Sequence, residues 1–229
     1  MKENELSPEV NQTIAKLASQ VLVTAREMAR KGLVVATWGN VSARATSDLV
    51  LITPSGMDYE EITPADLVVA DLKGVIVQGH RRPSTEMPLH SAIYRQYPQI
   101  QAIVHTHSLF ASVLAVARIP LPPILEELAQ MVGGTVPVSD YAPAGSSNLA
   151  QKVVKVLGPV PAALLANHGL VTVGKTLSEA LLISQVVEKG AQVYTYAQML
   201  GSPHFLPQDV VKALQNTYQN QYGQGPANN

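Results

Sequence analysis

The chain has 229 residues, of which 46% are hydrophobic, so it can bury a full core, and we expect one domain spanning residues 1–229. A formal net charge of -1 offers no basic surface for a phosphate backbone, so a nucleic-acid partner is not expected. The chain contains no cysteine, which excludes disulfides and thiolate nucleophiles and leaves histidine and carboxylates as metal ligands.

The sequence shows no targeting or membrane-spanning pattern. Residues 1–5 lack the apolar core of a signal peptide, and no apolar run approaches the length that crosses a bilayer. We therefore expect a soluble, cytoplasmic protein with no membrane partner.

Helical and β-type patterns are interleaved along the chain. Ser7 and Pro8 are typical of a helix start, and apolar residues at helical spacing continue that helix to about Gly32. Short strands, helices and turns then alternate, which favours an α/β fold. The expected strands are 49–53, 67–71, 75–78, 101–107, 135–138 and 162–166, and the expected helices are 87–97, 108–117, 147–157, 177–200 and 208–218. The tail 223–229, rich in Gly, Asn and Pro, is expected to be disordered.

Two histidines stand two positions apart at the end of a predicted strand. Side chains alternate along a strand, so His105 and His107 point to the same face. Neutral imidazole is a good ligand for zinc, and a catalytic zinc site has three protein ligands and an open position. By itself such a pair also fits two half-buried histidines that bind no metal.

His168 is a candidate for the third ligand. It follows the apolar run 162–166 and precedes Gly169, which lets the backbone approach another group closely. The remaining histidines fit structural roles better: His80 and His204 lie in polar turns, and His90 decorates the helix that follows Glu86.

Glu86 precedes a predicted helix and has two interpretations. It can be an ordinary first-turn carboxylate, favoured by the helix dipole after an N-cap at Ser84. It can also be a base beside an anion site made of helix N–H groups and two hydroxyls. The small-residue segments 37–42 and 53–56 also have two interpretations, as plain turns or as phosphate-binding loops.

Together, these segments resemble the class II aldolase/adducin family in order and spacing from about Leu17 to Tyr222. Within it they are most like aldolases that cleave a ketose 1-phosphate such as fuculose 1-phosphate. The resemblance implies a three-layer α/β/α fold with a central, mainly antiparallel sheet flanked by helices, assembled as a homotetramer with sites at subunit boundaries. The matching motifs are Gly39-Asn40-Val41-Ser42, Ile52-Thr53-Pro54-Ser55-Gly56, Pro83-Ser84-Thr85-Glu86, His105-Thr106-His107, Gly133-Gly134 and Asn167-His168-Gly169-Leu170.

The resemblance also implies a role for each site residue. His105, His107 and His168 would hold one Zn²⁺ per subunit. Glu86 would be the catalytic acid/base and a fourth metal ligand when substrate is absent, and Tyr222 would protonate the aldehyde oxygen. The substrate phosphate would be bound by Asn40, Ser55, Gly56, Ser84 and Thr85.

One departure leaves alternatives open. The aldolases place a tyrosine shortly before the Gly-Gly pair, where this chain has Glu127 with Glu126 beside it. Sugar-phosphate 4-epimerases and methylthioribulose-phosphate dehydratases of the same family carry an acidic residue in this stretch, although the epimerase insertion is missing. Adducin-like members are interaction modules without metal. The retained histidines and Glu86 favour a zinc-dependent lyase that splits a phosphorylated sugar into dihydroxyacetone phosphate and a small aldehyde.

Overall fold

The computed structural model describes residues 6–221, so Tyr222 and the tail 223–229 lie outside the described residues. The first helix, α1 (Pro8–Arg30), begins where the sequence predicts. The Ser7 hydroxyl accepts a hydrogen bond from the Val10 N–H, and Pro8 occupies the first turn, where its missing N–H costs nothing.

A mixed sheet forms the middle layer. Over residues 6–221 it has eight strands in the order β4-β3-β2-β1-β5-β8-β7-β6. Neighbouring strands are antiparallel except β6 and β7, which are parallel. The strands are β1 (Asn40–Arg44), β2 (Leu49–Ile52), β3 (Val68–Asp71), β4 (Ile76–Gln78), β5 (Ala102–Thr106), β6 (Val138–Ser139), β7 (Ala162–Leu165) and β8 (Gly169–Gly174).

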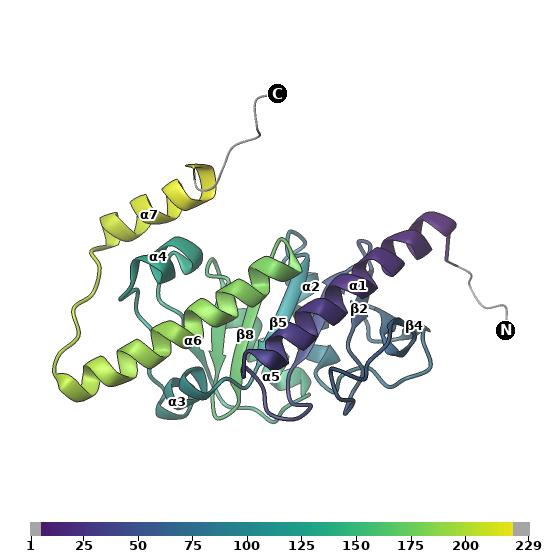
Figure 1. Ribbon diagram of the computed structural model, residues 1–229, viewed down its shortest axis with the longest axis horizontal. Helices are drawn as coiled ribbons and strands as arrows, with labels where there is room; N and C mark the ends of the chain where they lie inside the picture. Colours follow the sequence, from purple (N-terminus) through teal and green to yellow (C-terminus); the bar gives the residue numbers. More distant parts are fainter. Residues whose placement is uncertain (1–5, 222–229) are drawn as a thin grey trace.

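Helices cover both faces of this sheet. Buried side chains of α1, α3 and α6 pack against one face, and those of α2 and α5 pack against the other. Figure 1 shows α1 and α6 crossing the near face and α7 beside α4 at one end. The expected three-layer α/β/α fold with a mainly antiparallel sheet is confirmed. These helices are α2 (Met87–Gln96), α3 (Leu109–Ala117), α4 (Glu126–Val132), α5 (Ser147–Leu157), α6 (Leu177–Leu200) and α7 (Gln208–Gln221), with a short 3₁₀ helix η1 (Pro64–Asp66).

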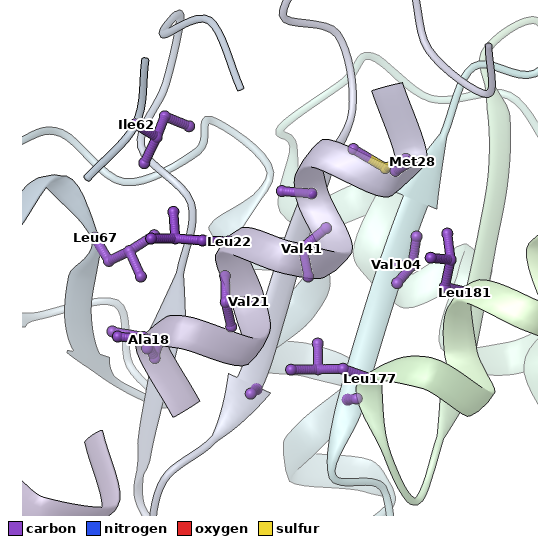
Figure 2. Packing of buried hydrophobic residues seen from close by; sticks show 14 of the residues in the cluster. Ala18, Val21, Leu22, Met28, Val41, Ile62, Leu67, Val104, Leu177 and Leu181 are labelled. Carbon is purple, nitrogen blue, oxygen red and sulfur yellow. The ribbon is translucent and has the colours of Figure 1, made fainter. Parts of the chain in front are cut away.

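Side-chain alternation in β1 divides the core between the two faces. Val41 packs with Val21 of α1 and Leu177 of α6 in one apolar cluster (Figure 2). Ser42 points to the opposite face, toward α2. Burying one such aliphatic side chain contributes about 1.5–3 kcal/mol, so the apolar face holds the strand while the polar face is free to build a site.

Within residues 6–221, helix α4 is additional to the expected elements, and three strand assignments differ from the expectation. Strand β1 occupies residues expected to form a turn, and β8 follows His168 where no strand was expected. The strand expected at 135–138 is wrong in its placement, because Val136 only bridges Leu121 and β6 begins at Val138. Each difference arises from pairing with distant strands, which local composition does not encode. In those described residues, no helix is long and apolar enough to cross a membrane.

Candidate active site

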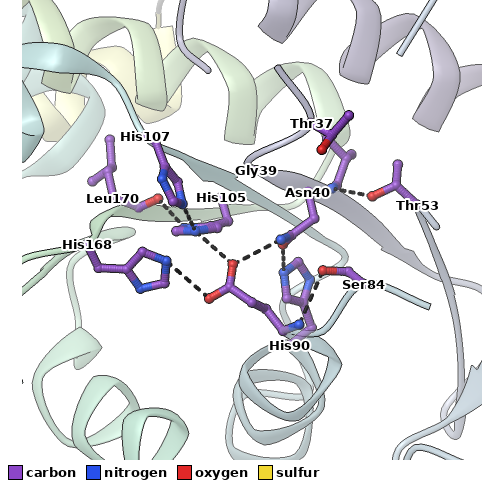
Figure 3. A network of polar contacts seen from close by, with 12 residues as sticks. Thr37, Gly39, Asn40, Thr53, Ser84, His90, His105, His107, His168 and Leu170 are labelled. Atoms are coloured by element: carbon purple, nitrogen blue, oxygen red, sulfur yellow. Dashed lines mark hydrogen bonds and ion pairs between the residues drawn. The ribbon is translucent and has the colours of Figure 1, made fainter. Parts of the chain in front are cut away.

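Four side chains from three separate segments meet at one end of the sheet (Figure 3). His105 is the last residue but one of β5, and His107 directly follows the strand. His168 lies in the β7–β8 hairpin, and Glu86 stands at the start of α2. Their potential ligand atoms all lie within 4.8 Å of one another. Each pair of imidazole rings has centroids 4.8 Å apart, so the three rings surround a common point.

Backbone geometry brings His168 to His105. The hairpin turns at Asn167, whose φ of 55° lies in the left-handed region that asparagine tolerates. Gly169 then passes so close to β5 that a Cβ would stand 2.2 Å from the Thr106 carbonyl oxygen. The close approach expected at Gly169 is therefore present, and it sets the distance between the two histidine-bearing segments.

The hydrogen bonds of His105 determine what the cluster can bind. Its Nδ1 lies 2.9 Å from the Leu170 carbonyl oxygen, and because a carbonyl only accepts, Nδ1 carries a proton. Its Nε2 faces Glu86 Oε2 at 2.8 Å and His107 Nε2 at 3.0 Å. Lone pairs at these separations repel unless a positive charge lies among them, either a second proton on His105 or a shared cation.

The donor set fits a divalent metal. Three imidazole nitrogens and one carboxylate are ordinary ligands of zinc, and the backbone acceptor on His105 Nδ1 is the support that ligating histidines usually have. Glu86 Oε1 is buried and has no hydrogen-bond partner among residues 6–221, although His168 Nε2 lies 3.5 Å away. A bound cation would satisfy this oxygen.

Burial and neighbouring charge shift the pKa values of three of the four side chains in the direction that metal binding needs. Burial lowers the pKa of His107 to about 3 and that of His168 to about 4, and the neighbouring His105 acts in the same direction. Burial opposes ionisation of Glu86, but His105, His168 and the Asn40 hydrogen bond outweigh it and hold the pKa of the carboxyl well below its usual range. For His105 burial is outweighed by Glu86, so its pKa is raised. Two imidazoles and the carboxylate are thus already deprotonated at neutral pH.

A cavity of about 550 Å³ opens beside the cluster. Glu86, His107 and His168 line it, whereas His105 is fully buried behind them. Its described lining includes no lysine or arginine, so any anion there would be held by neutral groups. All five residues expected to bind phosphate line the same cavity: Asn40, Ser55, Gly56, Ser84 and Thr85.

The structure revises the sequence-based interpretation of two residues, His90 and Ser84, and adds Trp38 to the cavity. His90 does not decorate its helix: it is 0% exposed and bonded to Asn40, and its spacing of four residues from Glu86 was the available signal. The Ser84 hydroxyl does not cap α2 but accepts a hydrogen bond from the Glu86 N–H. Trp38, not singled out before, lies at the cavity with 63% of its surface exposed, its ring stacked 6.4 Å from that of His107.

The two acidic residues before the Gly-Gly pair lie elsewhere. Both belong to the first turn of α4, where Glu126 is exposed and Glu127 pairs with Lys189 at 2.6 Å. Neither lines the cavity beside Glu86, so within one chain these two residues belong to the solvated face of a helix.

Comparison with known proteins identifies the family of this chain and agrees with its fold. Residues 19–195 match the model of the class II aldolase and adducin N-terminal domain, and the chain belongs to this family. It is 32% identical over 212 residues to the 5-deoxy-D-ribulose 1-phosphate aldolase of Bacillus thuringiensis serovar kurstaki, covering 92% of this chain and 99% of that protein. It is 34% identical over 190 residues to the 5-methylthioribulose-1-phosphate/5-deoxyribulose-1-phosphate aldolase of Rhodospirillum rubrum. That alignment covers 83% of this chain and 85% of the Rhodospirillum protein.

A solved structure is also close. An L-fuculose 1-phosphate aldolase superimposes with a TM-score of 0.86 at 34% identity, covering 89% of this chain and 96% of that chain. The resemblance to class II aldolases is confirmed, and the chain is an enzyme of this class, a carbon–carbon lyase.

Proposed function

We propose that this enzyme catalyses the reversible, zinc-dependent retro-aldol cleavage of a ketose 1-phosphate to dihydroxyacetone phosphate and a small aldehyde. The observation that carries the proposal is the convergence of Glu86, His105, His107 and His168 at a cavity whose other polar lining is uncharged. His105, His107 and His168 would hold the zinc. When bound, the ion would supply Lewis-acid stabilisation of the negative charge that develops beside the breaking bond.

The uncharged lining of the cavity suits a phosphate. Hydroxyls, a side-chain amide and backbone N–H groups are dipoles that together can balance a dianion without lysine. Ser55, Gly56 and Thr85 are exposed in the cavity wall, and Asn40 and Ser84 lie buried at its base. The relatives named above act on ketoses with a 1-phosphate, which is the same substrate class.

Glu86 is placed to move the proton of this reaction. Cleavage of the C3–C4 bond leaves its electron pair on C3 and the neighbouring oxygens, and C3 must then gain a proton to give dihydroxyacetone phosphate. Glu86 Oε2 accepts a hydrogen bond from Asn40 Nδ2 at 3.0 Å, whereas Oε1 faces the cluster with no hydrogen-bond partner. In the condensation direction, Oε1 is the atom we assign to removal of this C3 proton, and Tyr222 is the proposed donor of a proton to the aldehyde oxygen that becomes the C4 hydroxyl; cleavage reverses both transfers.

Trp38 offers a contact for the aldehyde end of the substrate. Its exposed indole stands beside His107 on the cavity rim. The two relatives are named for substrates with a deoxy or methylthio group at carbon 5, both of which are apolar ends. An aromatic face would favour such an end over a hydroxylated one.

Assembly and location complete the proposal. We place the single-domain protein in the cytoplasm, because phosphorylated sugars do not cross bilayers unaided. A homotetramer with sites at subunit boundaries is supported by a row of apolar side chains on α3. Leu109, Val113 and Val116 recur at helical spacing and are 67%, 40% and 58% exposed. Native mass measurement tests this assembly.

The reaction is tested with purified protein and a panel of ketose 1-phosphates that includes the 5-deoxyribulose and fuculose compounds. Release of dihydroxyacetone phosphate, followed with a coupled dehydrogenase, is expected, and it should stop on chelation and return with added Zn²⁺. Proton NMR of the same mixtures detects epimerised or dehydrated products. If an epimerised or dehydrated product forms without cleavage, the enzyme is an epimerase or a dehydratase and not an aldolase. If the protein shows no turnover and binds no metal, the interaction module is favoured.

A further inference from the structure

A chain of buried polar side chains leads from Glu86 into the space between α2 and the sheet, and Figure 3 shows its first members, Asn40 and His90. Asn40 Nδ2 lies 3.0 Å from Glu86 Oε2, and Asn40 Oδ1 lies 2.5 Å from His90 Nε2. His90 Nδ1 lies 2.6 Å from Ser42 Oγ, which lies 2.9 Å from the Tyr94 hydroxyl. All five residues are buried, with exposed fractions between 0% and 5%.

The chemistry of each group fixes the donor and the acceptor of every hydrogen bond in this series, so that all of them run in one direction. A carboxylate only accepts, so Asn40 must present its nitrogen to Glu86 and its oxygen to His90. That oxygen also only accepts, so His90 Nε2 carries the proton. Because His90 is completely buried, it is neutral and its Nδ1 is a bare acceptor.

The Ser42 hydroxyl therefore donates to His90, and the Tyr94 hydroxyl donates to Ser42. Every proton points toward Glu86. A chain of aligned hydrogen bonds of this kind polarises its members in the same direction.

Matching repeat distances explain why a helix and a strand can build this chain. Glu86, His90 and Tyr94 are spaced four residues apart on α2, which is about 6 Å along a helix axis. Asn40 and Ser42 are two residues apart on β1, which is about 6.6 Å along a strand. The side chains of the strand therefore fit between successive side chains of the helix, and each gap is closed by a hydrogen bond.

We propose that His90 is a positioning residue which, through Asn40, fixes the orientation of the Glu86 carboxylate for proton transfer. The inference rests on the proposed function, since it assigns the proton to Glu86. With Asn40 oriented by His90, one of its amide hydrogens is committed to Glu86 and the other remains for a substrate oxygen in the cavity. With Oε2 held in this way, Oε1 faces the reacting carbon in one orientation.

Two variants of His90 separate positioning from mere core packing. Glutamine places an amide N–H where Nε2 stands, so His90→Gln keeps the donor to Asn40. Asparagine reaches only the position of Nδ1, so His90→Asn keeps the Ser42 contact and loses the one to Asn40. We expect kcat on a ketose 1-phosphate to fall about ten- to a hundredfold in His90→Asn and to be largely rescued in His90→Gln.

A neighbouring residue provides the control. Ser91 lies on the same helix, is 2% exposed, and its hydroxyl is among the buried groups without a hydrogen-bond partner in the described residues. Ser91→Ala should therefore leave kcat unchanged. If both His90 variants lose kcat equally, with equal losses in thermal midpoint, His90 is a packing residue and the proposal is overturned.

Neutron diffraction from deuterated crystals of the zinc-loaded wild type tests the chain without any variant. We expect deuterium on His90 Nε2 and on Asn40 Nδ2, the latter pointing toward Glu86. We expect no deuterium on His90 Nδ1. Deuterium on His90 Nδ1, or a flipped Asn40, would overturn the proposal. Failure of the wild type to cleave any ketose 1-phosphate contradicts the proposed function instead, and the neutron result still decides the direction of the chain.

Discussion

Gly169 and Thr106 approach so closely that a Cβ on Gly169 would lie 2.2 Å from the Thr106 carbonyl oxygen. This contact joins the β7–β8 hairpin, which carries His168, to the end of β5, which carries His105. A side chain at position 169 must push the two segments apart because both sides of the contact are backbone. The spacing of the metal ligands therefore depends on a glycine that binds nothing.

We expect Gly169→Ala to lose zinc as well as stability. The overpacked contact should cost about 1–3 kcal/mol of unfolding free energy, and displacement of His168 should lower bound zinc measured by elemental analysis. Gly190→Ala is the control, since the nearest neighbours of its Cβ would be side-chain atoms of Leu128 and Leu121 from 3.3 Å outward. Full zinc occupancy in Gly169→Ala would show that the hairpin contact does not set the site.

Replacing Glu86 with glutamine should abolish turnover while fold and zinc are kept. Glutamine preserves the volume but accepts no proton, so we expect kcat to fall about a hundred- to ten-thousandfold. If Glu86 were only a first-turn helix residue, the variant would lose at most about 1 kcal/mol of stability and keep its activity. Turnover, zinc content and thermal midpoint measured on one sample separate these outcomes.

Ser55→Ala is the cleanest test of phosphate binding. Ser55 is exposed on the cavity wall, whereas the Ser84 hydroxyl also accepts the Glu86 N–H at 3.2 Å, so changing Ser84 disturbs the base as well. Loss of one hydrogen bond to a charged group should raise KM for the ketose 1-phosphate about tenfold or more. The unphosphorylated ketose should be a poor substrate of both proteins to the same degree. Equal loss with both sugars would mean that position 55 does not contact a phosphate.

Acid should destabilise the metal-free protein partly through His90. Burial lowers its pKa from the ordinary 6.5 to about 3. Between these two pH values the unfolded chain therefore binds one more proton than the folded protein. The contribution of the neutral His90 to the unfolding free energy is fully present above pH 6.5 and is lost as the pH falls toward 3. In His90→Gln the pH dependence of the unfolding free energy should be shallower by about 1.4 kcal/mol per pH unit in this window. Urea unfolding across that range gives the slopes, and parallel curves for the two proteins would contradict the assignment of His90 as a buried neutral group.

The residue types of the site and their local setting could be predicted from the amino-acid sequence. An H-x-H pair at a strand end has both imidazoles on one face because the strand repeat is two, and the structure places His105 and His107 in that way. The glycine after His168 indicated a close backbone approach, and one is present. The family resemblance then supplied the sheet type, which interleaved helices and strands alone do not distinguish.

That β1 is a central strand and that His90 lies beside the site could not be predicted without the three-dimensional fold. The run Asn40-Val41-Ser42-Ala43 is short and half polar, so it has no strong strand preference of its own. It becomes a strand because β2 and β5 pair with its two edges, and Asn40 thereby comes opposite His105. The pairing with β5 joins residues 59 to 65 positions apart, from Ala43 with Ala102 to Asn40 with His105, and its free energy comes from contacts that local sequence does not contain. The burial of His90 has the same cause: His90 contacts Asn40 and Ser42 of β1, and the local sequence does not predict that strand.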